Sequence, residues 1–166
     1  MVNRILKHLF AHPWQLRSAF PRATLDAIEA AIKASETRHR GELRFVIETA
    51  LPVHRVARGH TSRQQAIEVF SHLKVWDTEE NSGVLIYVLL AEHTLEIVAD
   101  RGITHRVEQH EWDAIARSMQ TAFRKGEFLQ GSLAGIEAIT QLLEQHFPPG
   151  EGNPNELPDR PVILKR

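Results

Sequence analysis

The chain has 166 residues and no cysteine. This absence excludes disulfide bonds, a catalytic thiolate, iron–sulfur clusters and zinc sites built on cysteine. Since cysteine-free chains suit a reducing compartment, we expect a cytoplasmic location. No stretch approaches the ~20 consecutive apolar residues of a membrane span. Charged and histidine side chains also interrupt the first 14 residues, where a secretory signal would be apolar.

An excess of charge of one sign is absent too, since the formal net charge is −1. Nucleic-acid binding depends on clustered cations, so we expect no nucleic-acid partner. Apolar residues make up 42% of the chain and charged residues 25%, which is typical of a globular protein. A chain of this length can bury a substantial core. The composition therefore predicts one globular domain of ordinary size.

The hydrophobic pattern predicts helices and strands that alternate along the chain. The 3.6-residue period indicates helices over residues 23–38, 111–124 and 129–147, and a capping-box pattern at Thr61 and Gln64 indicates the start of another. Strands are predicted over 42–50, 84–90 and 95–100. Because the first two enclose a helix, we expect them to be parallel with a right-handed crossover. The third follows a short turn and is expected to pair antiparallel.

These elements predict a three-layer α/β/α sandwich. Its small mixed sheet combines a parallel βαβ unit with an antiparallel hairpin strand, and helices cover both faces. We divide the chain into an amphipathic helical segment (1–22), the α/β domain (23–147) and an extended proline-rich tail (148–166). The first segment or the tail is the expected contact for a protein partner, and the apolar residues 162–164 of the tail are expected to dock either on the domain or on that partner. The oligomeric state does not follow from the sequence.

Several familiar sites are excluded by their missing residues. The chain has no P-loop, no dinucleotide-binding glycine pattern and no nucleophile elbow. An EF-hand is rejected because Ser82 stands where the loop needs glycine and Val88 where it needs glutamate. His8 and His12 have a spacing that can chelate a metal on a helix, but we expect both on a solvated helix face.

One polar cluster survives this comparison, at a single predicted end of the sheet. The acidic loop with Asp77 and Asn81 precedes the second strand, Asp100 ends the third, and Glu42 opens the first. If the first two strands are parallel and the third antiparallel, these residues converge. Hard divalent cations prefer oxygen ligands of this kind. The sequence therefore predicts a Ca²⁺ or Mg²⁺ site formed by Glu42, Asp77, Asn81 and Asp100.

A purely structural interpretation of the same residues remains open. Asp77 and Asn81 are also typical turn-capping residues, and Glu42 would then be solvated. Asp100 would pair with Arg101 or Arg44.

Several segments resemble the TPM domain family, which is named after a plant thylakoid-lumen protein and its relatives. The likeness extends from about residue 36 to about residue 143 and is strongest where an asparagine and a glycine lead into an apolar strand. The segments that carry it are residues 41–47, Ala66 and Phe70, Trp76, residues 81–86, 96–98 and 101–103, then Phe123, Gly126, Phe128, Gly131 and residues 138–139.

The resemblance implies a compact α/β sandwich that binds Ca²⁺ or another divalent cation at its loops. Carried over by position, the matching residues are Glu42, Asn81, Gly83 and Gly102, and Arg101 lies in the same loop as Gly102. Many bacterial relatives are exported and carry a membrane helix with a glycine-rich tail. Since neither feature occurs in this sequence, the resemblance points to a soluble bacterial branch without a membrane anchor.

Two functions from different classes are compatible with these residues. The first, which we favour, is a divalent-cation-binding accessory or interaction module, because no nucleophile–base pair accompanies the acidic cluster. The second is a metal-assisted phosphatase acting on phosphate esters, in which the cation activates water and Arg101 or Arg44 stabilises charge. The sequence does not decide whether the protein is an enzyme.

Overall fold

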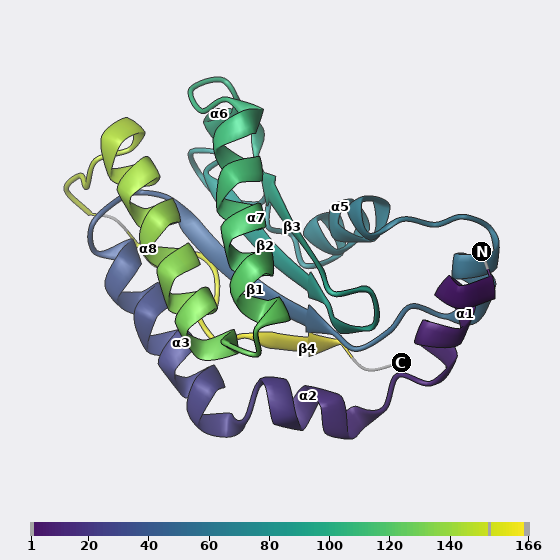
Figure 1. The fold of residues 1–166 in the computed structure, drawn as a ribbon. Coiled ribbons are helices and arrows are strands. Elements are labelled where there is room, and N and C mark those ends of the chain that lie inside the picture. Colours follow the sequence, from purple (N-terminus) through teal and green to yellow (C-terminus); the bar gives the residue numbers. More distant parts are fainter. Residues whose placement is uncertain (1, 153, 165–166) are drawn as a thin grey trace.

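The computed structural model describes residues 2–152 and 154–164 (Figure 1). Helices and strands alternate much as the hydrophobic pattern predicts. The elements are α1 (Val2–Leu9), α2 (Pro13–Ala19), α3 (Arg22–Glu36), β1 (Glu42–Glu48), α4 (Val53–Ala57), α5 (Ser62–His72), β2 (Gly83–Leu89), the 3₁₀ turn η1 (Leu90–Glu92), β3 (Thr94–Ala99), α6 (Arg101–Thr104), α7 (Gln109–Arg124), α8 (Phe128–His146) and β4 (Val162–Leu164).

The four strands form one mixed sheet in the order β3-β2-β1-β4. β1 is parallel to β2, with Glu42 opposite Gly83, and β2 is antiparallel to β3, with Val84 opposite Ala99. The predicted parallel crossover and antiparallel hairpin strand are thus both confirmed. As a result, the starts of β1 and β2 and the end of β3 lie at the same end of the sheet.

Helices cover the sheet on both faces, which confirms the three-layer sandwich (Figure 1). On one face, Phe45 and Ile47 belong to a core cluster with Ile32 of α3, Phe123 of α7 and Ile139 of α8. On the other face, Val46 and Leu85 pack in a second cluster with Ala66 and Phe70 of α5. All residues of β1 and β2 are therefore buried. The face of β1 that holds Arg44 and Glu48 is buried as well, because α5 and the C-terminal tail cover it.

The tail adds a fourth strand to the sheet. β4 runs parallel to β1, with Val46 opposite Val162 and Glu48 opposite Leu164. On its way there, the tail accepts hydrogen bonds from the guanidinium group of Arg44 at the carbonyl oxygens of Pro158 and Arg160. The apolar residues 162–164 are thus used within the domain, beside its central strand.

Two short helices, α4 and α6, lie in segments for which the sequence predicts neither a helix nor a strand. α4 begins after Pro52, in the segment expected to link β1 to α5. α6 begins immediately after β3, where the carboxylate of Asp100 accepts a hydrogen bond from the main-chain N–H of Arg101. Neither helix is long enough to show a hydrophobic period, so the sequence pattern contained no signal for them.

None of the helices in the described residues is both long and apolar enough to cross a bilayer.

Gly83 is required where the loop before β2 folds back over the strand. A Cβ atom at this position would collide with the carbonyl oxygen of Val75 and approach its carbonyl carbon to 2.9 Å. Main-chain atoms of a buried residue cannot move aside as a flexible side chain can. The asparagine–glycine entry into β2 is therefore a packing requirement as well as a turn.

We expect Gly83→Ala to lower the free energy of unfolding by about 3 kcal/mol or more, because the added methyl overpacks a rigid contact. Urea denaturation measures this loss. Gly150→Ala is the matched control, since its Cβ would meet only the flexible Arg40 side chain, at 3.3 Å. Equal stability of the two variants would contradict the close approach.

Candidate functional site

The predicted polar cluster lies at the end of the sheet where β1 and β2 begin. The loop of residues 78–82 is held there by its own hydrogen bonds. The N–H of Asn81 donates to the carbonyl of Thr78 at 3.2 Å, and the N–H of Ser82 donates to the hydroxyl of Thr78 at 2.9 Å. Asn81 has a left-handed backbone, with φ 52°. Asparagine tolerates this conformation better than most residues do, which explains its place in the turn.

Hydrogen bonds join this loop to the start of β1 and to the end of β3. The fully buried Ser82 accepts the N–H of Glu42 at its carbonyl oxygen and donates its hydroxyl to the carbonyl of Arg40. On the other side, the N–H of Gly102 donates to the carbonyl of Asn81 at 3.0 Å. The structure thus brings the 78–82 loop and the Asp100–Gly102 segment into direct contact.

Gly102 allows this contact because it has no side chain. A Cβ atom there would collide with the carbonyl oxygen of Glu80 and lie 2.6 Å from that of Asn81. Two main-chain oxygens of the loop therefore point toward the segment that begins at Asp100.

Asp100 is the buried carboxylate of this site, with 6% of its surface exposed. One oxygen, Oδ1, accepts the N–H of Arg101 at 2.7 Å and caps α6. The other oxygen, Oδ2, is buried and has no hydrogen-bond partner among the described residues. Buried polar atoms without a partner are rare, because each costs about 1–3 kcal/mol of desolvation. Oδ2 is therefore the atom of this cluster to which a ligand could bind.

Glu42 lies at the same end of the sheet, but its carboxyl group is already hydrogen-bonded to the C-terminal tail. Its Oε2 accepts the main-chain N–H of Leu157 at 3.0 Å, and only 1% of the residue is exposed. Burial raises the pKa of Glu42, which favours its neutral form over the carboxylate that a cation needs.

The other predicted residues differ in how they reach the site. Asp77 is exposed, and its N–H closes a turn on the carbonyl of Lys74. Arg101 is exposed beside Asp100, whereas Arg44 is buried against the tail. No group of three histidine, aspartate or glutamate side chains in residues 2–152 and 154–164 could hold a metal ion. A cation here would also need main-chain, amide or water oxygens.

Two further buried polar side chains, Glu36 and His39, lie next to this site, and the sequence analysis did not identify them. Burial raises the pKa of Glu36 to about 9, although its carboxylate accepts the N–H of Leu43. It also forms a hydrogen bond with the carboxyl group of Asp159 in the tail. Burial lowers the pKa of His39 to about 4, so this imidazole is neutral and accepts the N–H of Gly41 at Nδ1.

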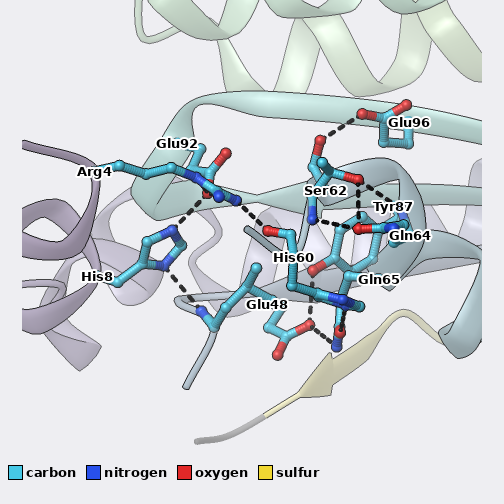
Figure 2. A network of polar contacts seen from close by, with 12 residues as sticks. Arg4, His8, Glu48, His60, Ser62, Gln64, Gln65, Tyr87, Glu92 and Glu96 are labelled. Carbon is cyan, nitrogen blue, oxygen red and sulfur yellow. Dashed lines mark hydrogen bonds and ion pairs between the residues drawn. The ribbon is translucent and has the colours of Figure 1, made fainter. Parts of the chain in front are cut away.

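A second polar network occupies the opposite end of the sheet, where β1 and β2 finish (Figure 2). The fully buried His8 accepts the N–H of Leu51 at Nδ1. Its Nε2 therefore carries a hydrogen and donates it to Oε1 of Glu92, with the nitrogen and the oxygen 2.6 Å apart. Arg4 donates to the same carboxylate at 2.7 Å. The prediction that His8 lies on a solvated face is wrong, because this network turns it inward. His12 is exposed and caps α2 instead.

The same network holds a buried carboxyl group at the end of β1. Glu48 accepts hydrogen bonds from the hydroxyl of Tyr87 at 2.7 Å and from the side-chain amide of Gln65 at 3.0 Å (Figure 2). Burial raises the pKa values of both Glu48 and Tyr87. With both donors in place, this network explains how an ionisable residue can end a central strand.

Three comparisons place the chain among known proteins. The TPM domain model matches residues 16–142. The NMR structure of the BA42 protein from the psychrophilic bacterium Bizionia argentinensis is similar, with a TM-score of 0.76 at 31% sequence identity, over 86% of this chain and 93% of that chain. The N-terminal domain of a P. gingivalis protein shares the fold, with a TM-score of 0.59 at 16% identity, over 76% of this chain and 77% of that chain. No curated protein matches.

We expect Glu36→Gln to flatten the fall in stability at alkaline pH. The folded protein keeps the proton of Glu36 up to about pH 9, whereas the unfolded chain releases it near the ordinary pKa of 4.5. The folded state thus binds more protons within this window, and its stability falls as the pH rises. Between about pH 7 and about pH 9, the free energy of unfolding of the variant should rise by about 1–2 kcal/mol relative to that of the wild type.

Urea denaturation across that pH interval measures the difference. The interval lies well above the pKa of His39, so this imidazole does not contribute to the result. The exposed Glu127→Gln is the control and should follow the wild type. Parallel curves for Glu36→Gln and the wild type would show that Glu36 is ionised in the folded protein.

Proposed function

Because the chain belongs to the TPM domain family, we propose that it is a divalent-cation-binding accessory domain whose cation binds beside Asp100. The observation that carries this proposal is the buried Oδ2 of Asp100, which has no hydrogen-bond partner in the described part of the chain. A cation would supply the missing interaction and neutralise the charge that the fold has buried.

The neighbouring oxygens suit Ca²⁺ better than Mg²⁺. The main-chain carbonyls of Glu80 and Asn81 approach the Asp100–Gly102 segment, and the side chain of Asn81 is exposed at the same turn. Ca²⁺ accepts carboxylate, carbonyl, amide and water oxygens in irregular geometry, whereas Mg²⁺ demands a near-ideal octahedron. The exposed carboxylates of Asp77, Glu79 and Glu80 add negative charge around the loop.

Glu42 does not fit the role of a ligand in this arrangement. The N–H of Leu157 satisfies one of its oxygens, and burial favours its protonated form. We therefore assign Glu42 to the anchoring of the tail, and Asp100 with the 77–82 loop to the cation. Gly83 and Gly102 act by permitting the close approach of these loops.

A metal-assisted phosphatase is the second candidate, and one observation favours it. Arg101 directly follows Asp100 and is exposed, so its guanidinium group could bind a phosphoryl oxygen beside the cation. Arg44 is unsuited to this role because it is buried and donates to carbonyls of the tail. Purified protein should then hydrolyse a generic phosphate ester with Mg²⁺, and Arg101→Ala should abolish turnover.

The cytoplasmic location and the protein partner stay predictions.

For the favoured function, we expect millimolar Ca²⁺ to raise the melting temperature of the wild type by several degrees relative to EDTA. A cation at 100 times its Kd stabilises the native state by about 2.7 kcal/mol. Asp100→Asn should lose this shift, because asparagine keeps the helix-capping oxygen but removes the negative charge. Thermal melts with Ca²⁺, Mg²⁺ and EDTA test the expectation.

The control variant is Asp113→Asn, at an exposed carboxylate on α7. It should keep the full shift. A shift that persists in Asp100→Asn would place the cation elsewhere, and no shift in the wild type would assign Asp100 to helix capping alone.

A further inference from the structure

Helix α1 presents Arg4 and His8 to the domain, packs Ile5 against the second core cluster, and exposes its other apolar side chains to solvent. Arg4 and His8 lie one turn apart on the face that packs against α4 and η1. Val2, Leu6 and Leu9 recur at helical spacing on another face, with 72%, 42% and 53% of their surface exposed. A surface helix usually turns its apolar stripe to the core, whereas these three apolar side chains of α1 face away from it.

The exposed apolar surface continues from α1 into α2. Phe10 and Trp14 are 72% and 62% exposed. Together with Leu6, Leu9 and the cations Lys7 and Arg17, they form what we call the α1–α2 surface. Figure 1 shows both helices at the periphery of the molecule. Ile67 and Trp76, each 48% exposed, are the only large apolar side chains outside residues 2–14 that are strongly exposed in the described structure.

A groove in this surface lies beside the same aromatic side chains. Its volume is about 350 Å³, and the residues that line it include Phe10, Trp14, Leu90, Phe128 and Lys7. No carboxylate lines it. Soluble domains rarely expose a contiguous apolar surface of this kind unless it binds something.

The charge of the segment indicates what binds there. No aspartate or glutamate precedes Asp26, whereas Arg4, Lys7, Arg17 and Arg22 are all cationic. Lys7 and Arg17 are exposed. The rest of the chain must carry net negative charge, since the whole has −1. The α1–α2 surface is therefore a basic, aromatic-rich part of a slightly acidic protein.

We propose that the α1–α2 surface binds the surface of an anionic lipid bilayer. Phenylalanine, leucine and tryptophan side chains enter the boundary between headgroups and acyl chains, while lysine and arginine remain at the anionic headgroups. A second copy of this chain is a poorer occupant, because a symmetric contact would place two cationic surfaces against each other. The contacts of His8 and Arg4 with Glu92 hold α1 in the orientation that exposes its apolar side chains.

This proposal is independent of the cation site, which lies at the other end of the sheet. Since α1 ends before residue 16, it also lies outside the segment that the TPM domain model matches.

Co-sedimentation with vesicles tests the proposal directly. The full chain should bind phosphatidylcholine vesicles that contain about one third phosphatidylglycerol, and high salt should weaken this binding. Vesicles of phosphatidylcholine alone should bind at least about tenfold less protein. In a Trp76→Phe background, the emission of Trp14 should shift to the blue on binding, because Trp112 is already buried.

Two pairs of substitutions separate the apolar and charged contributions. Phe10→Ser with Trp14→Ser should reduce binding at least about tenfold. Lys7→Gln with Arg17→Gln should reduce binding to the anionic vesicles by about fivefold per charge removed. Binding to the neutral vesicles should not change. The matched control is Ile67→Ser with Trp76→Ser, which removes two large exposed apolar side chains elsewhere and should bind like the wild type.

Four results would overturn the proposal. The first three are no binding to the anionic vesicles, equal binding to both kinds of vesicle, and an equal loss of binding in the control variant. The fourth is a wild type that does not bind vesicles but forms a dimer in light scattering, which Phe10→Ser with Trp14→Ser dissociates. The last result would assign the α1–α2 surface to a second copy of the chain. Thermal melts of each variant should match the wild type, since all of the substituted side chains are exposed.

Discussion

The central strand β1 is buried along its whole length although it contains Glu42, Arg44 and Glu48. Burying an ionisable side chain is unfavourable unless it is hydrogen-bonded or neutralised, and the rest of the architecture meets this requirement. The tail satisfies Glu42 through the N–H of Leu157 and Arg44 through two carbonyls, before it joins the sheet as β4. Tyr87 and Gln65 satisfy Glu48 at the other end of the strand. The domain therefore includes the tail, because β1 depends on the hydrogen bonds that the tail supplies.

The two ends of the sheet have different chemistry as a consequence. At the starting end, the buried carboxyl groups of Glu36, Glu42 and Asp100 lie near loops rich in carbonyl oxygens. Glu42 accepts the N–H of Leu157, and Glu36 interacts with Leu43 and Asp159. Oδ2 of Asp100 has no hydrogen-bond partner in the described residues, which is why we propose the cation at Asp100. At the finishing end, Glu92 binds Arg4 and His8 and thereby attaches α1 to the domain. With α1 attached in this way, Val2, Leu6 and Leu9 are exposed to solvent.

Much of the fold could be predicted because its long elements have clear periods. The apolar run of residues 84–90 indicated a central strand, and the position of Asp77, Asn81 and Asp100 at strand ends followed from the parallel and antiparallel pairing. The pairing of β4 could not be predicted, because three apolar residues in a proline-rich tail do not reveal a partner. The burial of His8 was also missed, since its partners Leu51 and Glu92 are distant in sequence and only the fold brings them together. The same holds for Glu36, whose contacts with Leu43 and Asp159 no local pattern indicates.

The most direct test of the cation site is a titration of the ¹⁵N-labelled protein with Ca²⁺, followed by NMR. The amide resonances of Asn81, Arg101 and Gly102 should move together and saturate, because these amides belong to the two segments that would enclose the cation. The competing location is the surface pocket of about 270 Å³ whose wall contains Glu79, Glu80, Glu151 and Glu156. Shifts confined to Glu151 and Glu156, or no shifts at all, would contradict a cation held by Asp100.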